Sequence, residues 1–112
     1  MWNVNERFEK KAIDSLAALG FGVVAFIHVT MERGHIRDLS NFKRLVAELA
    51  QIQECFSVTG DIDYVLKVVA KDLKSLSDFL LDTLMRIPGV SGVKSSVCLD
   101  EIKCTSAVPL EA

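Results

Sequence analysis

The stretch Thr-Gly-Asp-Ile-Asp-Tyr at residues 59–64 contains the side chains best suited to ligand chemistry. Gly60 leaves neighbouring backbone amides open to a ligand carboxylate, and Asp61 and Asp63 can neutralise an ammonium group. The same residues suit a plain hairpin turn, because Gly and Asp are preferred in turns. Turn preferences favour the plain hairpin turn, but residue chemistry alone leaves both a ligand site and a turn open. Thr59, Gly60, Asp61 and Asp63 are therefore candidate effector-binding residues.

Two adjacent serines, Ser95 and Ser96, form a second pair of candidates. They fall in a predicted strand, where neighbouring side chains point to opposite faces. One of the two must therefore face away from the helices, where it could donate a hydrogen bond to a ligand carboxylate. The alternative, a pair of ordinary strand hydroxyls, stays open although serine is not a preferred strand residue.

Metal binding is not expected from the spacing of the histidines and cysteines. His28, His35 and Cys55 lie on different predicted elements without the short spacings of zinc sites. Cys98 and Cys104 lie on one predicted strand, and a regular strand would hold them about 20 Å apart. That separation excludes an intrachain disulfide or a shared metal ion.

Catalysis and cofactor binding are not expected either. Neither histidine stands beside a serine or cysteine motif that would indicate an activated nucleophile. The chain contains no GxGxxG or GxxxxGK[ST] phosphate loop. We therefore predict a protein that is not an enzyme.

Composition indicates one small domain. Half of the 112 residues are apolar, and no run approaches the roughly 20 apolar residues that span a membrane. The charged N-terminus does not resemble an export signal, so we expect a cytoplasmic protein with reduced thiols. A net charge of −2 argues against binding nucleic acid through the overall field of the domain.

Strands are predicted where β-branched and aromatic residues gather between turn residues. These segments are 21–30, 54–58, 64–70 and 92–105. In the third, Tyr64 is expected to be packed. In the last, alternation places four side chains on one face, namely Val93, Ser95, Val97 and Leu99.

Two helices are predicted from apolar residues at helical spacing. Asp38 or Ser40 caps the first, and Asp72 caps the second, which Pro88-Gly89 ends. The apolar positions are Phe42, Leu45, Val46 and Leu49 in the first, and Leu73, Leu76, Leu80, Leu84 and Ile87 in the second.

The resulting order, strand, helix, strand, strand, helix, strand, is that of the ferredoxin-like α+β sandwich with an antiparallel sheet. Two helices can cover only one face of such a sheet. The first and third strands nevertheless have apolar residues on both faces, the second set being Val24, Phe26, Val65 and Val69. An uncovered apolar face predicts packing against a partner sheet and hence a dimer.

With the elements placed, several stretches resemble the C-terminal regulatory domain of Lrp/AsnC transcription regulators, the domain for regulation of amino-acid metabolism. They are residues 18–22, 58–69, 87–90, 93–96 and 104–110. Their order and spacing carry the resemblance, which runs from about Asp14 to Leu110. No single piece is specific.

The resemblance implies a small-molecule effector, an amino acid, bound near residues 59–63 at contacts between dimers. It places small hydroxyl residues such as Ser95 and Ser96 near that effector. It also implies a homodimer that can assemble further to an octamer. DNA contact is implied only through a helix-turn-helix domain, which the residues before Asp14 do not supply.

We therefore expect residues 1–13 to be a linker or N-terminal extension, and residues 14–112 to be the ligand-binding and oligomerisation domain, either alone or as part of a longer regulator. Two other functions stay open. One is a purely structural oligomerisation module whose turn acids are incidental. The other, less favoured, is a small dimeric enzyme, because ferredoxin-like folds also host enzymes.

Overall fold

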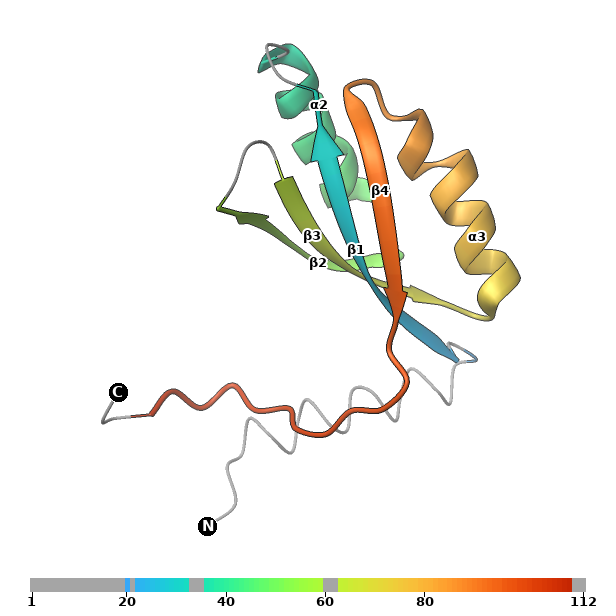
Figure 1. Cartoon of the computed structure of the whole chain (residues 1–112), viewed down its shortest axis with the longest axis vertical. Coiled ribbons are helices and arrows are strands. Elements are labelled where there is room, and N and C mark those ends of the chain that lie inside the picture. The colour runs from blue at the N-terminus through green and yellow to red at the C-terminus, as the bar shows by residue number, and fades with distance from the viewer. Residues whose placement is uncertain (1–19, 21, 33–35, 60–62, 110–112) are drawn as a thin grey trace.

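The part of the chain that the structure describes forms one antiparallel sheet with α-helices packed on one of its faces (Figure 1). The computed structural model describes residues 20, 22–32, 36–59 and 63–109. Within them the elements follow as β1 (Val23–Met31), α2 (Ile36–Glu48), β2 (Ile52–Val58), β3 (Asp63–Ala70), α3 (Leu73–Asp82), the short 3₁₀ helix η1 (Leu84–Arg86) and β4 (Val90–Val97). The strand order is β2-β3-β1-β4. The predicted ferredoxin-like α+β fold is confirmed.

The core lies between the sheet and the two helices. Alternate residues of β1 and β3 face the helices and are buried, and α2 and α3 each contribute an apolar stripe. The main members are Ala25, Ile27, Val29, Leu66 and Val68 from the sheet, with Phe42, Val46, Leu76 and Phe79 from the helices. Tyr64 is packed as predicted, its ring centroid 4.9 Å from that of Phe42.

α2 begins earlier than the sequence predicts. It starts at Ile36, so Asp38 and Ser40 lie inside the helix and neither is its cap. Asp38 instead occupies the first turn, where the helix dipole favours an acidic side chain.

α3 begins at the predicted cap. Asp72 Oδ1 accepts a hydrogen bond from the Ser75 backbone N–H at 2.7 Å. The buried stripe differs from the prediction, because Leu73 in the first turn is exposed and Phe79 is buried. The helix also ends at Asp82, before Pro88, and η1 carries Leu84 into the core.

The Pro88-Gly89 pair leads into β4, and here a glycine is required. Gly89 has φ +91, and a Cβ atom at this position would lie 2.7 Å from Cβ of Asp38. The close approach of this turn to α2 therefore needs a residue without a side chain.

The last strand is shorter than predicted. β4 ends at Val97, and Leu99 is 96% exposed, so Leu99 does not share a face with Val93. The reason is the length of its partner, because the backbone N–H of Cys98 donates to the carbonyl of Val24 at 2.7 Å and β1 begins only one residue before Val24. Beyond Cys98 the described residues provide no neighbouring strand to pair with, and Figure 1 shows the chain running away from the sheet.

Because β4 ends at Val97, Cys98 and Cys104 do not lie on the common strand that the sequence predicts. Cys98 and Cys104 are thiols that line one cavity of about 310 Å³ between the sheet and the C-terminal segment. The separation of about 20 Å that a regular strand would impose does not apply to them.

The sheet face opposite the helices carries the second apolar set, as the alternation predicts. We call it the open face. Cross-strand pairing places Val24, Phe26, Val58 and Val65 on it together with Phe56. Phe26 is 45% exposed and Phe56 is 57% exposed.

Candidate functional site

The hairpin between β2 and β3 holds the acidic candidate residues. Val58 pairs with Asp63 across the two strands, and Thr59 follows Val58 as an exposed turn residue. Asp63 is therefore the first residue of β3, at the base of the turn. Gly60 and Asp61 lie outside the described residues.

Asp63 contacts a histidine on the neighbouring strand. Thr30 of β1 is opposite Asp63, and His28 lies two residues along β1 on the same open face. Nε2 of His28 lies 3.6 Å from Oδ1 of Asp63. Sequence reasoning missed this contact because the two residues are far apart in the chain and only the register of β1 and β3 brings them together.

The two serines lie on opposite faces of β4. Ser96 is opposite Phe26 on the open face, and Ser95 is opposite Ile27 on the helix face. Both are exposed because β4 is an edge strand.

Within one chain the two serines do not meet Asp63. Between Ser96 and Asp63 lie two strand spacings and four residues along the strands. With spacings of about 4.8 Å and a rise of about 3.4 Å, the two residues are about 17 Å apart. The structure therefore brings Thr59 near Asp63 and leaves both serines at a distance.

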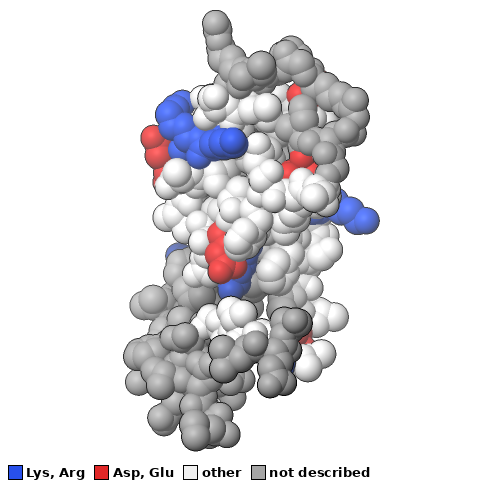
Figure 2. All heavy atoms as spheres, turned by 90° about the vertical axis from the view of Figure 1, so that its left-hand side faces the viewer, with Lys and Arg blue, Asp and Glu red and all other residues white. Residues whose placement is uncertain are grey.

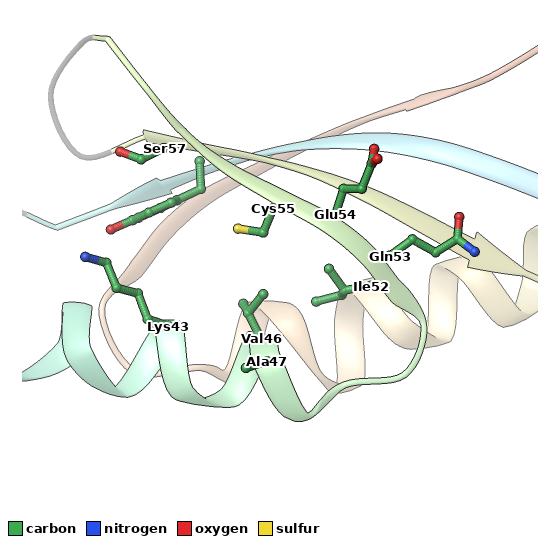
Figure 3. A pocket seen from close by; sticks show the side chains of 9 residues that line it. Lys43, Val46, Ala47, Ile52, Gln53, Glu54, Cys55 and Ser57 are labelled. Carbon is green, nitrogen blue, oxygen red and sulfur yellow. The ribbon is translucent and has the colours of Figure 1, made fainter. Parts of the chain in front are cut away.

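A cleft of about 480 Å³ opens between α2 and the edge strand β2. Figure 3 shows Lys43 at one end of it, the Cys55 thiol pointing into it, and Val46 of α2 facing Ile52 of β2. Partial burial raises the pKa of the Cys55 thiol. Sequence analysis did not predict this cleft.

Basic side chains are spread over the face of the molecule that Figure 2 shows. On that side, Lys and Arg side chains of the described residues lie at separate places, some of them beside Asp or Glu side chains, and do not form one continuous patch.

Among the described residues, no group of three His, Cys, Asp or Glu side chains is placed to hold a metal ion. Neither helix in the described part is long and apolar enough to cross a membrane.

Comparison with known proteins identifies the domain. Residues 24–108 match the model of the Lrp/AsnC ligand binding domain. The chain belongs to the Lrp/AsnC family. This match extends from β1 to the C-terminal segment and includes both the hairpin and the two serines.

Curated relatives of this Lrp/AsnC domain are transcriptional regulators. The chain is 41% identical over 85 residues to the Bkd operon transcriptional regulator of Pseudomonas aeruginosa, covering 76% of this chain and 56% of that protein. It is 35% identical over 85 residues to the leucine-responsive regulatory protein of Escherichia coli K12, covering 76% and 52%. The chain thus spans about half the length of the curated relatives it matches. The family and these relatives are regulators and not enzymes.

Solved structures agree with the family assignment. A transcriptional regulator from Neisseria meningitidis in complex with L-Met is 30% identical, with a TM-score of 0.78 over 94% of this chain and 75% of that one. Escherichia coli AsnC, at 18% identity and a TM-score of 0.73 over 92% of this chain and 74% of that one, shows the same fold.

Proposed function

We propose that this domain binds an amino-acid effector at the β2–β3 hairpin and that the bound effector shifts the assembly of the domain. Thr59, Gly60, Asp61 and Asp63 form the hairpin half of the site. The observation that carries the proposal is the Neisseria meningitidis relative, which aligns with nearly the whole chain and was solved with L-Met.

Amino-acid chemistry fits this half of the site. The Asp63 carboxylate lies at the base of the turn, where it can accept hydrogen bonds from the ammonium group that every free amino acid carries. The glycine beside Asp61 gives the turn the backbone freedom to present amides to the ligand carboxylate.

The geometry of the serines supports a site shared between copies. Ser95 and Ser96 lie too far from Asp63 to contact the same small molecule within one chain. A ligand that contacts both Asp63 and the two serines must therefore bind between the hairpin of one copy and β4 of another. Such a ligand favours the assembled state by the difference between its affinities for the two states.

The dimer itself is proposed to form through the open face. Phe26 and Phe56 expose large apolar surfaces there, beside Val24 and Val65. Pairing two such faces would remove these surfaces from water. In a regulator, a ligand-driven change of assembly would alter how its DNA-contacting parts are presented.

A thermal-shift screen against the twenty common amino acids tests the proposal. A ligand at 100 times its dissociation constant stabilises the native state by about 2.7 kcal/mol, which raises the melting midpoint of a domain this size by several degrees. We expect a shift with one amino acid or with a few of similar side chain. Uniform melting midpoints across the set would instead favour a structural oligomerisation module.

The double variant Asp61→Ala/Asp63→Ala locates the site. We expect it to fold and to lose the shift, because a partly exposed ion pair such as that of Asp63 with His28 contributes little to stability. The matched control Asp78→Ala/Asp82→Ala removes the same charge from α3 and should keep the shift. A response that survives in the hairpin variant would refute the assignment.

A further inference from the structure

The cleft between α2 and β2 is a structural feature that the hairpin site does not explain. β2 is an edge strand, and none of its residues is buried. Phe42 of α2 packs on Tyr64 of β3, and the cleft opens beside this contact, between α2 and the helix-facing side of β2. The resulting volume of about 480 Å³ lies within the range of roughly 300–1,000 Å³ that small-molecule sites occupy.

One end of the cleft is polar and positively charged. Lys43 of α2 reaches this end, where the side chains of Ser57 and Tyr64 also line the wall. Among the described residues no acidic side chain forms an ion pair with Lys43. An ammonium group with two hydroxyls beside it is suited to bind a carboxylate.

The rest of the cleft is apolar. Val46 and Ala47 of α2 face Ile52 of β2 across it, and the Cys55 thiol points into the middle (Figure 3). These side chains would cover a short hydrocarbon group attached to the carboxylate. The cleft therefore matches an amphiphilic molecule with an anionic head.

Among the described residues that line the cleft, Glu54 is the only acidic one. Its carboxylate is turned away from the cleft, and the strand register places Glu54 opposite Lys67 on the open face. A free amino acid would place its ammonium group in the field of Lys43 without a compensating charge. We propose that this cleft is a second binding site, specific for short-chain carboxylates that carry no ammonium group.

This site is distinct from the effector site proposed at the hairpin. Its lining comes from α2, β2 and Tyr64 of β3, whereas the proposed effector site uses Thr59, Asp63 and the serines of β4. The two proposals can therefore succeed or fail independently.

Alkylation of Cys55 provides a local readout. Iodoacetamide should modify Cys55 in the intact protein, slowly because burial raises the pKa of the thiol. Mass spectrometry of peptides reports Cys55 separately from Cys98 and Cys104, which lie elsewhere and act as internal controls. A Cys55 that reacts only after unfolding in urea would contradict an open cleft.

The probes are 4-methylpentanoate and leucine, which share a carbon skeleton and differ in the ammonium group. When 4-methylpentanoate is present at ten times its dissociation constant, about one protein molecule in eleven has no ligand bound. We expect it to slow alkylation of Cys55 about tenfold without changing Cys98 or Cys104. Equal protection by leucine, or none by 4-methylpentanoate at millimolar concentration, would overturn the proposed specificity.

Two variants complete the test. Lys43→Gln should weaken protection by 4-methylpentanoate at least tenfold, while Lys74→Gln, an equal change of charge on α3, should leave it intact. Protection should also persist in Asp61→Ala/Asp63→Ala, which removes the proposed effector site. Full protection in Lys43→Gln, or its loss in the hairpin variant, would contradict a separate carboxylate site.

Discussion

Replacing Phe56 by serine should dissociate the proposed dimer without unfolding the chain. Phe56 lies on the open face, and 57% of it is exposed. An aromatic side chain buries about 150–250 Å², so the exposed part is about 110 Å² in each copy. A twofold dimer uses the same patch twice, which gives about 220 Å² of apolar surface from this residue.

The apolar area that Phe56 contributes sets the expected loss of dimer affinity in Phe56→Ser. At about 25 cal/mol per Å², burying 220 Å² contributes about 5.5 kcal/mol before the costs of association. Ordering of side chains and imperfect packing reduce this value, so we expect a net loss of about 3 kcal/mol. That loss corresponds to a dissociation constant about 150-fold higher.

Sedimentation equilibrium over a concentration series measures this constant directly. Leu81→Ser is the matched control, because Leu81 is 56% exposed but belongs to α3 on the other side of the sheet. Circular dichroism should show both variants folded. A dissociation constant within twofold of wild type for Phe56→Ser, or an equal increase for Leu81→Ser, would refute dimerisation through the open face.

Two further predictions concern the stability of the fold. Leu84 is fully buried where η1 meets the core, so Leu84→Ala should lower the free energy of unfolding in urea by about 2–5 kcal/mol, and a loss below about 1 kcal/mol would contradict its role. The hydrogen bond from the Ser75 backbone N–H lowers the pKa of Asp72 below its ordinary value of 3.8. The stability from this cap is therefore fully present above pH 3.8 and is lost as the pH falls through the folded-state pKa. Urea unfolding should show wild type more stable than Asp72→Ala at pH 6, with a smaller difference at pH 3; a constant difference would argue against the cap.

Much of the fold could be predicted from local pattern. Alternation identified the strands, and helical spacing identified α2 and α3, because these periods reflect which side chains a sheet or helix buries. The ends of elements depend on neighbours that local pattern does not contain. β4 stops at Val97 because β1 provides no further partner, and α3 buries Phe79 in place of Leu73 because its orientation depends on the sheet beneath it.

The candidate site could be predicted only in part. Asp63 was identified from its turn, and the structure places it at the base of the hairpin. Its contact with His28 depends on the register of two strands that are distant in sequence. The cleft around Cys55 depends on how far α2 reaches across the sheet toward β2, which no local pattern of residues encodes.

The most direct test of an effector-controlled assembly is sedimentation velocity with and without the amino acid that gives the largest thermal shift. We predict that the amino acid changes the distribution of assembled species at a constant protein concentration, and that Asp61→Ala/Asp63→Ala abolishes this change. An identical distribution in the presence and absence of saturating amino acid would contradict the proposal that the effector controls assembly.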